Sequence, residues 1–302
     1  MLGRLLVDIV KNGVARISSS SDKPNVIPLD DVNCLVKGRH GWFLANQYDH
    51  YLGRALIYYG EYGEIEHEFL NSLLRQGDHV IEVGANIGTH TVGLAKAVQP
   101  EGSVIAIEAQ PAIFRILCAN LALNGLQNVL PFGLGCGAQK GTMSVPPIDY
   151  QVPSAHNSGG VSLDRSGNGI PVSIVPIDEL LGDYSGSGIK FRLLKIDVEG
   201  MERDVLMGAS RLIKEHRPLL YVENDRVQES QALIEWIMAA GYRLWWHIPP
   251  LFNPSNFFGL SENIYGNVAS FNMLCVPAET SLSVTDQLTE LTDSSFHILR
   301  NR

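Results

Sequence analysis

The 302-residue chain lacks several features that would point to other classes of protein. Its four cysteines are scattered without C-x-x-C spacing, and three of them sit within apolar runs, so we expect reduced core thiols. No stretch approaches the roughly 20 apolar residues of a membrane-spanning helix. The first apolar run is too short for a signal peptide before charge interrupts it, which makes a cytoplasmic enzyme the default expectation.

Positive charge is also scarce. The chain has 23 Lys and Arg against 32 Asp and Glu, a net charge of −9, and no visible basic cluster. Nucleic acid is therefore disfavoured as the main partner, because neutralising phosphates requires clustered Lys and Arg. With 45% hydrophobic and 18% charged residues, the composition is that of an ordinary globular protein, and most of the chain should fold.

The most informative stretch is residues 80–91, where a buried strand leads into a glycine-rich turn and then a helix. Its glycines let the main chain approach a ligand, with the N–H groups of a helix start behind them. A second strand, residues 104–108, ends in Glu108, 24 residues past Gly84, where a carboxylate can hold both hydroxyls of a ribose. We therefore expect a nucleotide-like cofactor. The candidate contacts in the first stretch are Glu82, Gly84, Ala85, Asn86 and Gly88.

The turn lacks the G-x-G-x-x-G fingerprint of a dinucleotide site. Its second and third glycine positions are Asn86 and Thr89, which disfavours pyrophosphate binding and hence NAD. S-adenosylmethionine fits the E-x-G-x-N-x-G pattern better, because it has no pyrophosphate and its amino group and sulfonium need acceptors such as Glu82. A tight turn without any ligand is the alternative, and Glu108 counts against it.

Apolar runs alternate with amphipathic segments along most of the chain. The alternation predicts a doubly wound α/β sheet of seven strands, Rossmann-like and mostly parallel. The expected strands begin with the run ending near residue 83 and continue at 104–108, 129–134, 191–196, 218–222, 242–246 and 271–276. The expected helices lie near 48–59, 65–74, 89–98, 111–123, 201–215 and 228–240.

Two regions interrupt this alternation within an expected catalytic domain of residues 61–277. Residues 135–188 are rich in Gly, Pro and Ser, and residues 249–270 separate the last two strands. Both should emerge where ligands bind in open α/β sheets, so we expect them to form substrate walls. Residues 1–60 are expected to be a β/α extension that serves as a lid or as the interface of a homo-oligomer. Residues 278–302 read as a peripheral helix or tail.

A second group of polar residues surrounds the end of the fourth strand. Lys195 and Asp197 share one strand face, so a buried ion pair supporting the sheet is one interpretation. The next strand ends in Glu223 and Asn224, and adjacent strand ends meet at one crevice. Two carboxylates and an amide oxygen, from Asp197, Glu223 and Asn224, are what a hard cation such as Mg²⁺ selects. A solvated cluster of acids without a metal is the other interpretation.

The segments IEVGANIG (81–88), LKIDVEGME (194–202) and LYVE (220–223) together resemble the FkbM family of S-adenosylmethionine-dependent methyltransferases. The resemblance covers about residues 58–276. It implies a class I methyltransferase sheet with its last strand antiparallel, and methyl transfer mostly to hydroxyls of sugars, polyketides or other natural products. The acceptor would then be a small molecule or a glycan. The strand-end trio is also similar to the metal site of catechol O-methyltransferase, which implies Mg²⁺ or Mn²⁺.

Methyl transfer requires a protein to align the acceptor and to remove its proton. The candidate catalytic residues are Asp197, Lys195 and His247. Lys195 could act as a base if burial lowered its pKa, although the flanking carboxylates favour a structural role. His247 ends a strand ahead of an expected substrate loop, and it is either a site residue or an edge residue.

The segment before the first strand holds two more candidates for the cofactor side. Tyr62 and Glu64 lie where class I enzymes commonly close over the cofactor, and Glu64 could equally be a helix-start acid. His90, one turn into the helix after the glycine turn, either packs or contacts a ligand. The sequence as a whole predicts an O-methyltransferase. A non-catalytic nucleotide-binding or assembly protein of the same fold is the alternative.

Overall fold

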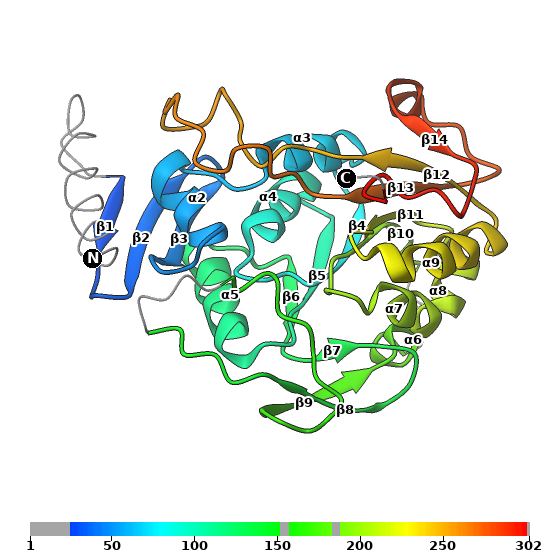
Figure 1. The fold of residues 1–302 in the computed structure, drawn as a ribbon, viewed down its shortest axis with the longest axis horizontal. Coiled ribbons are helices and arrows are strands. Elements are labelled where there is room, and N and C mark those ends of the chain that lie inside the picture. Colours follow the sequence, from blue (N-terminus) through cyan, green and yellow to red (C-terminus); the bar gives the residue numbers. More distant parts are fainter. Residues whose placement is uncertain (1–24, 152–156, 183–187, 301–302) are drawn as a thin grey trace.

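The computed structural model describes residues 25–151, 157–182 and 188–300. Its centre is an eight-stranded sheet, seen across the middle of Figure 1. In spatial order the strands are β14 (Thr289–Leu291), β12 (Tyr242–His247), β13 (Asn272–Pro277), β11 (Leu219–Glu223), β10 (Phe191–Ile196), β4 (His79–Val83), β5 (Ser103–Ile107) and β6 (Val129–Phe132). The strands from β11 to β6 pair in parallel, whereas β13 is antiparallel to both of its neighbours.

Helices cover both faces of this sheet, because its strands bury both sets of side chains. Ile81 and Val83 of β4 contribute to the core cluster under one group of helices, and Val80 contributes to the cluster under the other group. The first group is α6 (Ile177–Leu180), α7 (Glu202–Gly208), α8 (Ser210–His216) and α9 (Val227–Ala239). The second group is α3 (Glu64–Ser72) and α4 (Thr89–Val98). The expected doubly wound α/β fold is therefore confirmed.

The part of the N-terminal extension that the structure describes is a small antiparallel sheet followed by a helix. These elements are β1 (Val26–Pro28), β2 (Asn33–Gly38), β3 (Gly41–Asn46) and α2 (Leu52–Tyr59). They share one core cluster with α5 (Pro111–Leu123), beside which they lie in Figure 1. Asn120 and Asn124 use their amides to bond the backbone N–H and C=O groups of Leu44 and Trp42 on β3. The extension is thus fastened to the domain along a helix.

The last part of the chain differs from the expectation of a peripheral helix or tail. A 3₁₀ helix, η2 (Ser283–Gln287), leads into β14, which pairs antiparallel with β12 and buries Leu291. The tail therefore supplies an eighth strand where seven were expected. His297 is also buried, and its Nε2 lies 3.0 Å from the carbonyl oxygen of Asn224.

Two further segments differ in detail from the predicted elements. The helix predicted near residues 201–215 is two helices, α7 and α8, with Ala209 between them. The insertion at 135–188 contains a separate three-stranded sheet of β7 (Gly135–Cys136), β8 (Gly141–Val145) and β9 (Ile170–Val175).

All four cysteines are free thiols, as expected. Among the described residues, no helix combines the length and the apolar character needed to cross a membrane.

Candidate functional site

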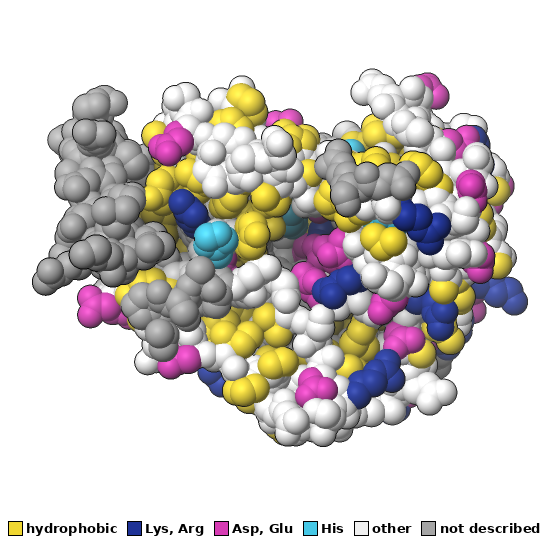
Figure 2. All heavy atoms as spheres, in the orientation of Figure 1, with side chains coloured by type: hydrophobic (Ala, Val, Ile, Leu, Met, Phe, Trp, Pro, Cys, Tyr) yellow, Lys and Arg dark blue, Asp and Glu magenta, His cyan; other side chains and the backbone are white. Residues whose placement is uncertain are grey.

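The order of strands in the central sheet reverses between β4 and β10. From β4 the chain continues outward to β5 and β6, and from β10 it continues in the opposite direction to β11. Ligands bind at such a switch point, outside the carboxyl ends of the strands. A cavity of about 400 Å³ lies there. Figure 2 shows a hollow in the middle of this face, with acidic side chains inside it.

The cavity is lined by many more acidic than basic side chains. Among the described residues, its lining includes a single lysine, Lys195. The acidic side chains that line it are Glu66, Glu82, Glu108, Asp197, Glu199, Glu223 and Asp225. Both chain insertions also contribute to the lining, the first through residues such as Gly159 and Val161 and the second through Leu251 and Ser270. The insertions therefore lie where they were expected, at the carboxyl edge of the sheet.

The glycine turn after β4 lines the cavity, but its glycines are required by protein atoms. At Gly84, φ is +88° and an added Cβ would lie 1.7 Å from the carbonyl oxygen of Asp197. At Gly88, φ is again +88° and an added Cβ would lie 2.8 Å from Leu117 of α5. The sequence pattern predicts that both glycines allow the approach of a cofactor. In the structure, the absence of a side chain at these two glycines allows β4, β10 and α5 to pack together.

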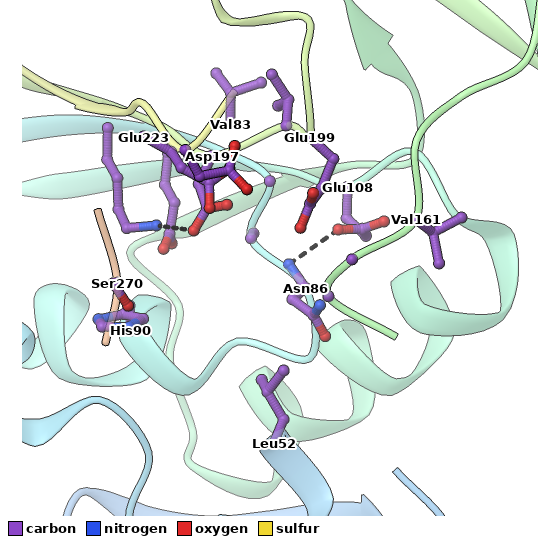
Figure 3. A pocket seen from close by; sticks show the side chains of 18 of the residues that line it. Leu52, Val83, Asn86, His90, Glu108, Val161, Asp197, Glu199, Glu223 and Ser270 are labelled. Carbon is purple, nitrogen blue, oxygen red and sulfur yellow. Dashed lines mark hydrogen bonds and ion pairs between the residues drawn. The ribbon is translucent and has the colours of Figure 1, made fainter. Parts of the chain in front are cut away.

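Glu108 is positioned to hold a ligand beside this turn. It is buried, and its two oxygens accept backbone hydrogen bonds from Asn86 at 2.9 Å and from Gln110 at 2.7 Å. Figure 3 shows Glu108 and Asn86 at one side of the cavity. Burial, with a smaller contribution from Asp197, raises the pKa of Glu108 to about 7, and the backbone N–H groups of Gln110, Asn86 and Ala109 oppose that rise. Each oxygen keeps a lone pair for a hydroxyl of a bound ligand.

Lys195 and Glu82 are register partners on neighbouring strands at the floor of the cavity. Both are buried, and the ammonium of Lys195 lies 3.1 Å from Asp197 Oδ2. Although burial lowers the pKa of Lys195, Asp197, Glu66 and Glu82 outweigh burial and raise it above its usual value. Lys195 is therefore held as a cation, which is the structural role that the sequence favoured. A role as base would require a lowered pKa, which the acids around Lys195 oppose.

Three carboxylates converge at the ends of β10 and β11, as Figure 3 shows. Oxygens of Asp197, Glu199 and Glu223 all lie within 4.8 Å of one another. Burial and the neighbouring acids raise the pKa of Glu223, and its Oε2 is buried without a hydrogen-bond partner. The sequence placed Asn224 in this group in place of Glu199. In the structure Asn224 does not line the cavity, and its Nδ2 donates to Ser230 Oγ at 2.9 Å and to Met273 Sδ.

Two other expected site residues do not line the cavity. His247 packs between aromatic rings, stacked on Phe69 with 3.9 Å between ring centroids and 2.7 Å from the Tyr221 hydroxyl. Burial lowers the pKa of His247 to about 4. Glu64 turns to the N-terminal extension, where its carboxylate lies 2.7 Å from His40. Neither residue is placed to take part in catalysis or cofactor binding, whereas Tyr62 does line the cavity.

The structure adds residues that the sequence argument did not select. Glu66, Ser270 and Asn272 line the cavity together with His90, and Figure 3 shows Ser270 and His90 across it from Glu108. Glu66 belongs to a helix without a recognisable motif, and Ser270 and Asn272 lie at the start of an antiparallel strand. A sequence signal for Glu66 exists only in retrospect, since an acid on the buried face of an amphipathic helix is unusual.

The sheet order, the reversed β13 and the cavity at the switch point define a class I methyltransferase fold. The family profile described as "Methyltransferase FkbM domain" matches residues 82–244, which is more than half of the chain. The protein therefore belongs to the FkbM methyltransferase domain family, as the resemblance implied.

Individual relatives are more distant. Methyltransferase sdnD of Sordaria araneosa is 28% identical over 154 residues, covering 43% of this chain and 59% of that protein. The hexuronic acid methyltransferase AglP of Haloferax volcanii is 29% identical over 152 residues, and the match covers 49% of this chain and 58% of AglP. The solved structure of methyltransferase FkbM from Methylobacillus flagellatus KT has a TM-score of 0.45 and 19% identity, covering 67% of this chain and 45% of that one. The matches thus span less than three fifths of the curated relatives.

Proposed function

We propose that this protein is an S-adenosylmethionine-dependent O-methyltransferase that acts on a hydroxyl of a sugar, a uronic acid or another natural product. The observation that carries the proposal is the acid-lined cavity at the switch point of a class I methyltransferase sheet. Membership of the FkbM family supports the reaction class. The name of one relative, a hexuronic acid methyltransferase, supports a carbohydrate acceptor.

The chemistry of the lining fits S-adenosylmethionine. The ligand carries positive charge on its sulfonium and amino groups, and the cavity offers seven carboxylates against one lysine. Glu108 would hold the ribose hydroxyls, beside the backbone of Ala85 and Asn86. Glu82 and the backbone near Gly84 would face the methionine end, with Tyr62 across the cavity. When bound, the cofactor supplies an electrophilic methyl group.

A divalent cation fits the three carboxylates of Asp197, Glu199 and Glu223. Three acids this close repel one another unless protons or a cation neutralise them, and hard cations such as Mg²⁺ or Mn²⁺ prefer carboxylate oxygens. We include this cation in the proposal, with Glu199 in the place that the sequence argument gave to Asn224. At this position it would neutralise the floor of the acceptor site, which would otherwise repel the carboxylate of a uronic acid.

Two measurements test the proposed function. Isothermal titration should detect binding of S-adenosylhomocysteine, and an assay of S-adenosylhomocysteine release should be run over hexuronic acids, neutral sugars and phenols. We expect binding together with turnover of at least one carbohydrate class. Binding without turnover across the whole panel would instead support the non-catalytic nucleotide-binding alternative.

A further inference from the structure

Glu66 stands out among the cavity residues because it comes from a helix, α3, and not from the end of a strand. Its side chain is buried and lines the cavity. Its carboxylate accepts a hydrogen bond from Asn272, with 3.2 Å between Asn272 Nδ2 and Glu66 Oε2. It also accepts a side-chain hydrogen bond from Ser270. His90 Nε2 lies 3.9 Å from Oε1, too far for a hydrogen bond. Figure 3 shows His90 and Ser270 across the cavity from Glu108, so Glu66 belongs to the wall away from the ribose side.

The acids on the cofactor side are already engaged. Glu108 accepts one backbone hydrogen bond on each oxygen. Glu82 accepts a 2.6 Å hydrogen bond from the Thr91 hydroxyl and is the register partner of Lys195. Both residues are fixed on the strand ends that would face the cofactor, so neither is placed to reach an acceptor hydroxyl.

The strand-end acids on the other side are engaged as well. Asp197 is paired with Lys195, and Glu199 is paired with Arg226 at 2.6 Å. A carboxylate oxygen of Glu223 lies within 4.8 Å of oxygens of both Asp197 and Glu199. A carboxylate that is ion-paired, or that would bind a cation, is a weak proton acceptor. Glu66, like Glu108, accepts hydrogen bonds from neutral donors, but its partners Asn272 and Ser270 place it on the wall away from Glu108.

We propose that Glu66 is the general base of this site and removes the proton of the acceptor hydroxyl. This inference rests on the O-methyl transfer proposed above. The acceptor oxygen forms its bond to the methyl carbon while the bond from that carbon to sulfur breaks, and the electron pair of the broken bond stays on sulfur. The hydroxyl proton passes to a carboxylate oxygen of Glu66. The products are the methyl ether, S-adenosylhomocysteine and protonated Glu66, which returns its proton to solvent when products leave.

The surroundings of Glu66 support this role. Burial raises its pKa to about 7, Lys195 opposes that rise, Asp197 adds to it, and Asn272 and Ser270 oppose it. A base whose pKa lies near the working pH is the most effective. The neighbouring imidazole is a poorer choice, because burial and Lys195 lower the pKa of His90. The titratable groups facing Glu66 are Lys195 of β10, Asp197 just after that strand, His90 of α4, Tyr221 of β11, and Tyr62.

The test compares Glu66→Gln with Glu68→Gln in the full chain, using the best acceptor of the panel. The Glu68→Gln substitution makes the same chemical change on the same helix, but at a side chain that is exposed. For Glu66→Gln we expect kcat to fall roughly 10²- to 10⁴-fold, with the Kd for S-adenosylhomocysteine within about threefold of wild type. Wild-type kcat should rise with pH to a plateau as Glu66 loses its proton, and the variant should lose this rise. Glu68→Gln should behave as wild type.

The outcomes separate the two proposals. A wild-type protein that turns over no acceptor contradicts the proposed function. If wild type is active but Glu66→Gln keeps its kcat within threefold and retains the rise with pH, Glu66 is not the base. The pH profile of the variant is needed because burial also raises the pKa of Glu82 and Glu108 to about 7. The wild-type profile alone therefore does not identify which of the three acids is the base. If Glu66→Gln does not fold, Glu66→Ala with added formate replaces it. Recovery of turnover with formate supports the inference, and a folded variant without recovery overturns it.

Discussion

The carbonyl oxygen of Asp197 occupies the space into which any side chain at Gly84 would project. An ideal Cβ at position 84 would lie 1.7 Å from that oxygen. The turn after β4 and the end of β10 are therefore in direct contact at the floor of the cavity, and the Asp197 backbone N–H donates to the carbonyl of Val83 at 3.0 Å. Because both halves of the site meet here, a change at Gly84 should disturb cofactor and acceptor sides together.

Gly84→Ala should destabilise the fold strongly. The substitution adds a clash with a backbone atom, which has little freedom to move, to the strain of a left-handed φ, and together these should cost about 3–5 kcal/mol. Gly77→Ala is the matched control, since Gly77 has φ +86° but nothing within 4 Å of its Cβ position. That variant should lose only about 1–2 kcal/mol. Urea unfolding measures both values, and equal losses would contradict the explanation.

Glu108→Gln should weaken cofactor binding. Each carboxylate oxygen accepts a backbone N–H, so an amide places its own NH₂ against one of those donors and leaves a buried N–H unpaired. We expect the Kd for S-adenosylhomocysteine to rise at least roughly tenfold, by isothermal titration. Glu101→Gln, which changes an exposed acid, should leave the Kd unaltered. Unchanged affinity in Glu108→Gln would remove Glu108 from the cofactor site.

His67→Gln should make the folded protein less sensitive to acid. Burial, with a smaller contribution from His40, lowers the pKa of His67 to about 3 in the folded state. As the pH falls below about 6.5, the unfolded chain takes up a proton that the folded protein excludes, so stability is lost with falling pH. Between pH 7 and 5, wild type should lose about 2 kcal/mol more than the variant. Urea unfolding at both pH values checks this, and His50→Gln controls for loss of an exposed imidazole.

Removal of divalent cations should abolish turnover. EDTA treatment should inactivate the protein, and Mg²⁺ or Mn²⁺ should restore it, because Asp197, Glu199 and Glu223 otherwise repel one another and an acidic acceptor. Glu223→Gln should weaken Mg²⁺ binding at least roughly tenfold by calorimetry. Asn224→Ala should leave it unchanged, since that amide is bonded to Ser230 and Met273. Full activity in chelator would exclude the cation.

Local patterns in the sequence predicted the strands and the glycine turn well. The helix at α4 and the strand at β10 have the predicted bounds, because apolar periodicity and turn residues act within a few positions. β14 left no such signal. It is three residues long, and it is a strand because β12 offers a free edge to pair with, which is a property of the folded sheet.

The site was harder to predict because it depends on the direction of individual side chains. Glu64 and Glu66 are two positions apart on α3, about 200° around the helix, so they face different sides. The sequence pattern predicts Glu64 as a cofactor-side residue, whereas the packing of α3 on the sheet turns Glu66 into the cavity. Asn224 is similar, because its direction is set by Ser230 and by Met273 of a strand that follows much later in the chain.

The residues that line the cavity lie both inside and outside the segment that matches the family profile. Residues 82–244, which match the family profile, carry Glu82, Glu108 and the strand-end acids. Glu66 precedes this segment, and Ser270 and Asn272 follow it. The matched segment therefore includes the residues that we propose for the methyl donor, whereas Glu66, Ser270 and Asn272 lie outside it. On the proposed function, we expect an exchange of α3 and the start of β13 between family members to change the acceptor preference and to keep the same methyl donor.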